Sequence, residues 1–370
     1  MIRAVLVDDE PPARVRMRQL LDAVGGVTVV GEAGSAVEAR DVIRDTRPDV
    51  LFLDVEMPEV RGTALAASLP EPRPFIVFAT AFDNYGLDAI AVEATDYLLK
   101  PVSRVKLAAT LDRVRSRLDR LAVERDVAAA SKVQTHMWPG SLPRIPGFDC
   151  AAASLPARGV GGDFYDVFPI NDQAYALLLG DASGKGVAAG LVASAVQARV
   201  NAAARHAHLD AEELMAAVDR DVYATTDGAR YATAVYAVLD ASTSRLVLVN
   251  AGHPAVLVLS PSIRTLTASG PALGLIEAGT FGSHSVKLVP GAIVVAYTDG
   301  VVEACNDAGD EFGETHLGEL INAHRARPAA AICTAVLDTI RAHRGMRQDQ
   351  DDVTVMVLKR EGWRLEGLRS

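Results

Sequence analysis

The chain has 370 residues, 49% of them hydrophobic, with a formal net charge of −10 and a pI near 5.3. At about 150 residues per domain, this length suggests two or three domains with real cores. The charge argues against a nucleic-acid partner, because phosphate backbones are bound by clustered Lys and Arg. Acid-rich sites attract metal cations instead.

The cysteines and the apolar segments give no sign of secretion or of a membrane. Cys150, Cys305 and Cys333 lie far apart without CxxC spacing, so neither a disulfide framework nor a thiolate zinc site is predicted. The start, MIRAVLVDDEPP, is a short apolar run that ends in acids, which is typical of a buried strand and not of a signal peptide. No stretch approaches the ~18 apolar residues of a membrane span. We therefore expect a cytoplasmic protein with no membrane partner.

Residues 1–118 alternate short β-rich runs with helical patterns such as ARVRMRQLLDAV. In chain order the β-rich runs are RAVLV, VTVVGEA, DVLFLD, FIVFAT and DYLLK. This alternation predicts βαβ units, and hence a parallel sheet with helices on both faces. We expect an α/β domain with a doubly wound five-stranded parallel sheet, whose ligands bind at the carboxyl ends of the strands.

Polar residues end four of these strands. Asp8 and Asp9 follow the first run, Asp54 the third, Thr80 the fourth and Lys100 the last. One acid in such a place could be a helix cap, but five aligned residues are not explained that way. Three crowded carboxylates would repel a phosphate unless a divalent cation neutralises them. Thr80 and Lys100 can then hold phosphoryl oxygens while Asp54 attacks phosphorus.

The motifs VDDE, FLDVEMP, FATAF and DYLLKP resemble the receiver domain of two-component response regulators over residues 1–118. The resemblance implies a flavodoxin-like fold with Asp54 as the phosphoacceptor. It also implies a Mg²⁺ ion, bound by the side chains of Asp9 and Asp54 and by the backbone carbonyl of Glu56, with Asp8 as their close companion.

The same resemblance implies a switch and a phosphodonor. Thr80 and Tyr97 become the switch pair, Lys100 the phosphate contact, and a sensor histidine kinase the donor. The stretch AFDNYGLDAIAVEATDYLLKP is most similar to receivers that carry LytTR-type DNA-binding outputs. Nothing basic enough follows it, so a DNA-binding output is not expected.

A charged, strand-free segment follows, and we expect a helical linker over residues 119–136. Apolar residues recur at the 3-4-3 spacing of a two-helix coiled coil, namely Leu111, Val114, Leu118 and Leu121. A shifted register is offered by Val123, Val127 and Ala130. We expect a homodimer that pairs along this seam, with a change of register within it. The alternative is one amphipathic helix that lies on its own domain.

The segment WPGSLPRIPGFD opens the next domain. Residues 137–360 are predicted to form an α+β domain, followed by a tail at 361–370. The strand patterns look antiparallel, as in YALLLGDAS, YATAVYAVLD, SRLVLVNAG, AVLVLS, AIVVAYTDG and DVTVMVLK. Helical patterns occupy roughly 187–205, 211–224 and 328–342. We expect sheets that carry the core and helices that cover them.

This domain has a second set of acids beside its β-runs: Asp163 in GGDFYD, Asp181 in LLLGDASGKG, Asp299 in AYTDG, and Asp351 with Asp352 in QDDVTV. Each of these acids taken alone could be a turn residue or a helix cap. Together, without thiolates or paired histidines, they favour Mg²⁺ or Mn²⁺ over zinc. Two such ions can lower the pKa of a shared water and stabilise an in-line attack on phosphorus.

The string GDASGKG also has a faint likeness to a nucleotide-binding P-loop. That motif needs four residues between its glycines and a Ser or Thr after the lysine, whereas three residues separate Gly180 from Gly184 and Gly186 follows Lys185. An acid in the loop would face the phosphates. We reject the P-loop interpretation.

Six strings, PARGVGGDFYDV, LLLGDASGKGVAAGL, VNAGHPAVLVL, ALGL, YTDGVVEA and DQDDVTVMVL, together resemble the metal-dependent PPM-type serine/threonine phosphatases. The similarity is to the bacterial branch of sporulation and stress-response phosphatases. It implies an antiparallel β-sandwich flanked by helices and two bound Mn²⁺ or Mg²⁺ ions. The implied ligands are Asp181 as the bridge, the Ala182 carbonyl, Asp163 for the second metal, and Asp299 with Asp351 for the first. Asp352 is the alternative to Asp351, because spacing does not separate adjacent acids.

Three further polar residues lie in the matching motifs. His253 and Glu303 are given no catalytic role, because a lone His in a GHP turn is more often structural. Asp166 fits a turn residue or a residue behind the ligands.

The two resemblances together imply a response regulator with a protein phosphatase as its output, controlled at Asp54. The implied substrate is a phosphorylated STAS-domain anti-sigma-factor antagonist. The alternative is a phosphorylation-controlled binding protein that uses a non-catalytic phosphatase fold. Retention of the metal acids favours catalysis.

Overall fold

The computed structural model describes residues 1–81, 94–155, 159–206, 209–226, 228–345 and 351–362. Parts of the motifs named above, at residues 82–93, 156–158 and 349–350, lie outside the described residues, as does most of the predicted tail, from residue 363. The chain divides into two compact units, Met1–Arg125 and Asp126–Ser370, and the division falls inside one long helix. The domain limits predicted after residues 118 and 136 stay predictions.

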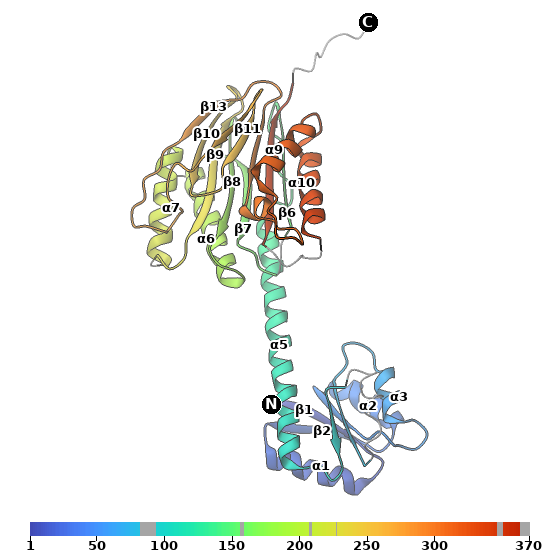
Figure 1. The fold of residues 1–370 in the computed structure, drawn as a ribbon. Coiled ribbons are helices and arrows are strands. Elements are labelled where there is room, and N and C mark those ends of the chain that lie inside the picture. Colours follow the sequence, from blue (N-terminus) through green and yellow to red (C-terminus); the bar gives the residue numbers. More distant parts are fainter. Residues whose placement is uncertain (82–93, 156–158, 207–208, 227, 346–350, 363–370) are drawn as a thin grey trace. The chain divides into compact units, whose positions relative to one another are not determined.

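Unit 1 is a parallel α/β domain. In chain order its elements are β1 (Ile2–Val7), α1 (Pro11–Val24), β2 (Val27–Ala33), α2 (Ala36–Thr46), β3 (Val50–Leu53), α3 (Gly62–Ser68), β4 (Phe75–Thr80), β5 (Asp96–Leu99) and the first part of α5 (Arg104–Met137) (Figure 1). The five strands pair in parallel, in the order β2-β1-β3-β4-β5. The predicted sheet is confirmed, and the carboxyl ends of β1, β3, β4 and β5 share one edge.

Local sequence signals set the helix starts and the faces of this sheet. Ser35 caps α2 by accepting a hydrogen bond from the Glu38 N–H at 3.2 Å, and Glu38 Oε2 accepts from the Gly34 N–H at 2.7 Å. This arrangement is close to a capping box, except that the Glu38 carboxylate bonds the residue before the cap. Along β1, Leu6 packs into one apolar cluster and Val5 into the other, because successive strand residues face opposite ways.

Unit 2 contains two antiparallel sheets, each of five strands. The first has the order β13-β10-β9-β8-β7 and the second β12-β11-β14-β15-β6. The strands are β6 (Phe148–Leu155), β7 (Asp163–Pro169), β8 (Ala174–Ala182), β9 (Ala232–Asp240), β10 (Arg245–Ala251), β11 (Val256–Leu259), β12 (Ile263–Leu266), β13 (His284–Lys287), β14 (Ile293–Tyr297) and β15 (Val353–Arg360). The helices are α6 (Val187–His206), α7 (Ala211–Thr226), α8 (Asp299–Val302), α9 (Gly313–Ala323) and α10 (Ala329–Arg344). The expected α+β architecture is confirmed.

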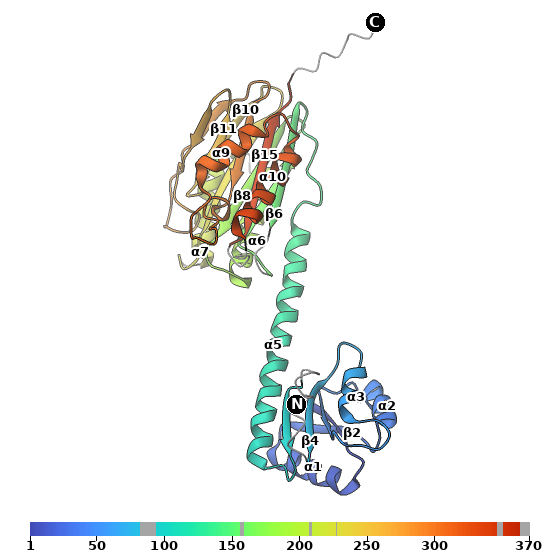
Figure 2. The same cartoon turned by 45° about the vertical axis from the view of Figure 1, so that its right-hand side comes forward.

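Unit 2 has four layers, namely two sheets with helices on both outer faces, and an apolar cluster lies between each pair of neighbouring layers. One cluster lies between the two sheets. Another lies between the first sheet and helices α6 and α7, and the last lies between the second sheet and helices α9 and α10. Figures 1 and 2 show these helices on the two outer faces of the sandwich. The alternation along β8 builds two of the clusters, because Leu178 faces the helices while Leu177 and Leu179 face the other sheet.

Among the described residues, α6 is the one helix long and apolar enough to cross a membrane. Its buried residues include Ala189, Val192, Val196 and Val200, and they pack into the cluster that α6 shares with α7 and the first sheet. That packing is what a core-covering helix of an α+β domain requires.

Helix α5 corrects the predicted coiled-coil seam. Leu111 and Val114 are 1% and 0% exposed and belong to the core of unit 1, and Leu118 packs against the same cluster. Leu111 and Val114 are therefore unavailable to a second chain, and the amphipathic-helix interpretation holds for this stretch. Leu121 and Val123 remain exposed. The predicted shift of register lies close to the division between the two units, near Arg125.

Candidate functional sites

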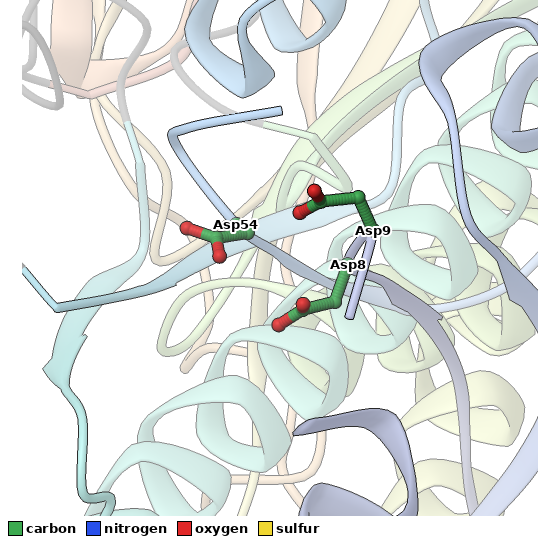
Figure 3. A group of neighbouring side chains, drawn as sticks. All are labelled: Asp8, Asp9 and Asp54. Carbon is green, nitrogen blue, oxygen red and sulfur yellow. The ribbon is translucent and has the colours of Figure 1, made fainter. Parts of the chain in front are cut away.

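The first site is the acidic edge of the parallel sheet. Asp8 and Asp9 follow β1 and Asp54 follows β3, and their carboxylates approach one another in Figure 3. One oxygen from each lies within 4.8 Å of the others, close enough to hold a single metal ion. The Glu56 N–H donates to Asp54 Oδ1 at 3.3 Å, which places Glu56 beside the three acids.

A lysine and a threonine complete this site. Lys100 Nζ donates to Asp8 Oδ2 at 2.6 Å and to Asp54 Oδ2 at 2.7 Å. Burial disfavours the charged ammonium, but the bonds to Asp54 and Asp8 outweigh it and raise the pKa of Lys100 above its ordinary value. The Thr80 hydroxyl is fully buried and has no hydrogen-bond partner among the described residues. Tyr97 is half-buried on β5. A cavity of about 430 Å³ opens beside Asp54 and Lys100.

The second site begins with a cross-strand pair. Asp163, the first residue of β7, is in register with Asp181 near the end of β8. Gly162 allows this approach, because a Cβ there would lie 2.5 Å from Asp181 Oδ1 and 2.7 Å from the Ala182 carbonyl oxygen. Both distances are too short for any side chain, so the position requires glycine.

Two loops bring the remaining acids. Asp299 opens the short helix α8 after β14, and Asp351 and Asp352 directly precede β15. The two loops touch, because a Cβ on Gly300 would lie 1.9 Å from the Asp352 carbonyl oxygen. The Asp351 side chain is 53% exposed and Asp351 Oδ2 lies 3.1 Å from Lys185 Nζ. Asp352 is buried, and its Oδ2 accepts a hydrogen bond from the Gly162 N–H at 3.0 Å.

Asp163 lies deepest, at 3% exposure. Its Oδ2 accepts hydrogen bonds from the hydroxyls of Thr298 at 2.8 Å and Thr354 at 2.6 Å. Thr354 Oγ1 is also 2.9 Å from Ser154 Oγ, and the Thr354 N–H donates to Thr298 Oγ1 at 3.0 Å. These bonds fix one oxygen of the Asp163 carboxylate, Oδ2, in place.

The raised pKa values of these acids indicate that their carboxylates need a positive charge to balance them. Burial raises the pKa of Asp163 well above its usual range, and repulsion from Asp181 adds to the effect. Burial, with repulsion from Asp299, raises the pKa of Asp181 to about 7. Burial and Asp351 likewise raise the pKa of Asp299. A divalent cation with oxygen ligands would reverse these shifts, and the donor set contains only carboxylates and carbonyls. The residues therefore fit such a cation.

The structure brings the predicted acids together in a particular pattern. Asp181 interacts electrostatically with Asp299 and Asp351, and also with Asp163. Asp352 also interacts with both Asp163 and Asp181, so the five acids form one electrostatically coupled cluster. Among the described residues, one group of acids has an oxygen from each member within 4.8 Å of the others, and it consists of Asp8, Asp9 and Asp54.

The polar residues set aside in the sequence lie outside this arrangement. His253 is buried, its Nδ1 is 2.8 Å from Thr233 Oγ1, and burial lowers the pKa of His253 to about 3. Asp166 Oδ2 accepts from Asn201 Nδ2 at 3.0 Å. Burial, together with Asp299, raises the pKa of Glu303.

Sequence reasoning missed Thr298, Thr354 and Gln134. The two threonines adjoin predicted acids in TDG and DDVTV, so their position beside a carboxylate was the available signal. No sequence signal marked Gln134, because it lies in the linker, 27 residues before the glycine it contacts. Its Nε2 donates to the Gly161 carbonyl at 2.7 Å and its Oε1 accepts from the Gly161 N–H at 3.0 Å.

Comparisons with known proteins agree with both halves of the fold. A family model described as "Response regulator receiver domain" matches residues 4–112. A second, described as "Stage II sporulation protein E (SpoIIE)", matches residues 171–361, just over half of the chain.

Curated relatives match the receiver. The transcriptional regulatory protein BtsR of Salmonella typhi is 48% identical over 116 residues, which is 31% of this chain and 48% of that protein. An uncharacterized response regulatory protein of Vibrio parahaemolyticus is 39% identical over 147 residues, 40% of this chain and 58% of that protein. The chain thus spans about half the length of these relatives.

Solved structures match the second half. The RsbU and RsbW domains of a Mycobacterium tuberculosis protein align with a TM-score of 0.53 and 28% identity, over 60% of this chain and 62% of that one. The SiaA PP2C domain of Pseudomonas aeruginosa aligns at 0.58 and 19% identity, over 65% and 98%. The PP2C domain of Bacillus subtilis SpoIIE aligns at 0.52 and 17%, over 59% and 64%. The last two show the fold alone.

The fold and the two family models define a chain with a receiver domain followed by a domain of the PP2C phosphatase fold. The chain belongs to the stage II sporulation protein E family, and it carries a receiver domain before the family's phosphatase domain.

We expect Asp181→Asn to stabilise the metal-free phosphatase domain. The folded-state pKa of Asp181 is about 7 against an ordinary 3.8, so the folded state binds this proton more tightly than the unfolded chain. In EDTA, stability should therefore fall as pH rises from about 4 to 8. The upper bound is ~4 kcal/mol, and we expect the variant to gain about 2 kcal/mol at pH 8 and to show a smaller slope, because Asp163 and Asp299, whose pKa values are also raised, keep part of it.

The measurement is urea unfolding in EDTA at several pH values, followed by tryptophan fluorescence. Both tryptophans of the chain, including Trp138, lie beyond the receiver, so the signal reports the phosphatase domain. The control is Asp172→Asn at an exposed turn. Equal slopes in parent and Asp181→Asn would contradict the crowding argument.

Proposed function

We propose that the chain is a metal-dependent phosphoserine/phosphothreonine protein phosphatase whose activity is controlled by phosphorylation of Asp54. The observation that carries the proposal is the cluster in which Asp181 interacts with Asp163, Asp299 and Asp351 while burial and repulsion raise the pKa of three of these acids. Acids brought together at this electrostatic cost are expected at functional sites.

In the proposed reaction the residues of this chain hold charge in place. Asp181 would serve two Mn²⁺ or Mg²⁺ ions, with Asp163 on one side and Asp299 with Asp351 on the other. The Ala182 carbonyl, which lies beside Gly162, would add a neutral ligand. When bound, the ions would lower the pKa of a water molecule and offset the charge on a phosphoryl group. No covalent intermediate with the protein is needed.

The structure favours Asp351 over Asp352 as the ligand. The Asp352 carboxylate is buried and already accepts a hydrogen bond from the Gly162 N–H. The Asp351 carboxylate is half-exposed, interacts with Asp299, and has an exposed lysine, Lys185, as its ion-pair partner. We therefore propose that Asp352 holds the Gly162 loop in place while Asp351 binds metal.

In the receiver, Asp9, Asp54 and the Glu56 carbonyl would bind Mg²⁺, with Asp8 beside them. Asp54 would accept the phosphoryl group from a sensor histidine kinase. Lys100 already bonds to Asp54 and would contact the phosphoryl oxygens. The unpartnered Thr80 hydroxyl offers the next donor, and its movement would reposition Tyr97.

Helix α5 offers a route from the receiver to the phosphatase site. Its first part packs into the receiver core through Leu111 and Val114. Its last part contacts the loop before Asp163, where Ser131 Oγ donates to the Gly159 carbonyl at 2.8 Å and Gln134 makes two bonds to Gly161. A change in the end of this helix would therefore act on the loop that carries Asp163. We propose that phosphorylation shifts an equilibrium between two states of α5.

The partners belong to the same proposal. The family resemblance favours a phosphorylated STAS-domain anti-sigma-factor antagonist as the substrate, in the cytoplasm. A homodimer would use residues of α5 that stay exposed, among them Leu121, Val123 and Val133. The alternative, a binding protein with a non-catalytic phosphatase fold, would not need acids with such raised pKa values at its metal site.

We expect Asp299→Asn to abolish turnover, because it removes a charged ligand. The test is hydrolysis of an aryl phosphate and of a phospho-STAS protein with excess Mn²⁺. The matched control is Asp310→Asn, an exposed acid eleven residues later. Full activity of Asp299→Asn would rule out the two-metal mechanism, and an inactive but Mn²⁺-binding parent would favour the alternative.

We expect Asp54→Asn to block labelling by a small acyl-phosphate donor and to leave basal phosphatase chemistry unchanged, because the two acidic clusters belong to different units. Labelling is followed by mass spectrometry. Labelling of the variant at the parent's stoichiometry would show that Asp54 is not the acceptor.

We expect Gln134→Ala to uncouple the phosphatase rate from the phosphodonor, because it removes both bonds between α5 and Gly161. The measurement is phosphatase rate against acyl-phosphate concentration, with mass in solution recorded in parallel. Thr135→Ala is the matched control, since this neighbouring side chain is exposed and its hydroxyl bonds only to α5 itself, at Ser131. A donor response equal to the parent's in Gln134→Ala would make α5 a passive tether.

A further inference from the structure

A buried arginine lies behind the phosphatase site, at the end of α10. Arg344 is 4% exposed, and its Nη2 donates to the Gly300 carbonyl at 3.1 Å and to the Asp351 carbonyl at 2.9 Å. One nitrogen thus holds the backbone on both loops that bring acids to the site, because Gly300 follows Asp299. Arg344 Nε is buried without a hydrogen-bond partner among the described residues.

Burial of this guanidinium is unfavourable in itself. An isolated charge taken from water costs several kcal/mol unless it is well paired, and a buried donor without an acceptor adds to that cost. An apolar side chain of similar size would fill the space with less loss. A residue kept here as arginine must therefore provide something that packing does not.

The two carbonyl bonds suggest what that is. Each loop carries a carboxylate that repels the other, since Asp351 raises the pKa of Asp299. The loops nevertheless touch at Gly300 and Asp352. A planar guanidinium holds two acceptors at a fixed separation, which a lysine ammonium on a flexible stem does not do.

We propose that Arg344 is a positioning residue of the metal site: it holds the loops of Asp299 and Asp351 at the separation at which both carboxylates serve one divalent cation. This inference rests on the proposed two-metal function. Arg344 touches neither substrate nor cation, and it acts through the two backbone carbonyls.

Charge and geometry predict opposite effects on metal affinity. A positive charge beside the site repels a divalent cation, so its removal alone would tighten binding. Loss of a group that orients metal ligands typically weakens metal affinity by about 10- to 100-fold. The carboxylates of Asp351 and Asp352 interact electrostatically with Arg344 and partly offset its charge, so we expect geometry to dominate.

The experiment is calorimetric titration of Mn²⁺ into the metal-free full chain, with Asp9→Asn in every sample to remove the receiver's own site. The variants are Arg344→Lys, which keeps the charge and loses the planar fork, and Arg344→Met, which removes the charge at similar volume. The matched control is Arg341→Met on the same helix, whose side chain is 54% exposed and pairs with Asp338 at 2.9 Å.

We expect both Arg344 variants to bind Mn²⁺ 10- to 100-fold more weakly at one site and Arg341→Met to stay within twofold of the parent. The Mn²⁺ concentration for half-maximal hydrolysis of an aryl phosphate should rise equally, with KM for the phosphate unchanged at saturating Mn²⁺. A purely structural arginine would lower the unfolding midpoint in EDTA and leave Mn²⁺ affinity unchanged.

Two results would overturn the inference, and a third would overturn the function on which it rests. Parent-like affinity in both variants would show that Arg344 does not position the loops. Parent-like affinity in Arg344→Lys with tighter binding in Arg344→Met would show that only its charge acts. If Arg344→Met fails to fold, the Mn²⁺ affinity of Arg344→Lys alone tests the inference. A parent that binds no Mn²⁺ in the Asp9→Asn background would overturn the proposed two-metal function itself.

Discussion

Repulsion between crowded carboxylates is the constraint on which both halves of this chain depend. Three acids share the receiver edge with oxygens within 4.8 Å, and in the phosphatase domain burial and neighbouring acids raise the pKa values of Asp163, Asp181 and Asp299. Such groups oppose folding until a counter-charge arrives. The surrounding structure must therefore hold them together, and it does so with donors: Lys100 in the receiver, and backbone N–H groups, threonines and Arg344 in the phosphatase domain.

The two sheets gather their acids by different routes. In the receiver, parallel strands end at one edge, so acids that follow β1 and β3 meet there directly. In the antiparallel domain, Asp163 and Asp181 meet by cross-strand register, and Asp299 arrives on a loop. Both sites also depend on close backbone approach, because a Cβ on Gly62 would lie 1.9 Å from the Asp54 carbonyl oxygen and one on Gly300 1.9 Å from the Asp352 carbonyl oxygen.

The sequence predicts most of the sheets and the acids, because both signals are local: an alternating or apolar run, and an acid at its end. It fails where the partner is distant or is backbone. Leu111 and Val114 have coiled-coil spacing, yet a helix that covers its own sheet has the same periodicity, and only the receiver core distinguishes the two. Gln134 and Arg344 bond to backbone groups of Gly161, Gly300 and Asp351, and no side-chain motif records such contacts.

The continuity of α5 limits how a signal could pass along it. A single helix from Arg104 to Met137 has buried residues in the receiver core and bonds to the loop before Asp163. A helix transmits displacement only if its end has two arrangements of different free energy, because a packed element does not deform continuously. Gln134 suits such an end, since its amide either pairs with both polar atoms of Gly161 or leaves both buried groups without partners. The cost of the second arrangement is what phosphorylation of Asp54 would have to offset.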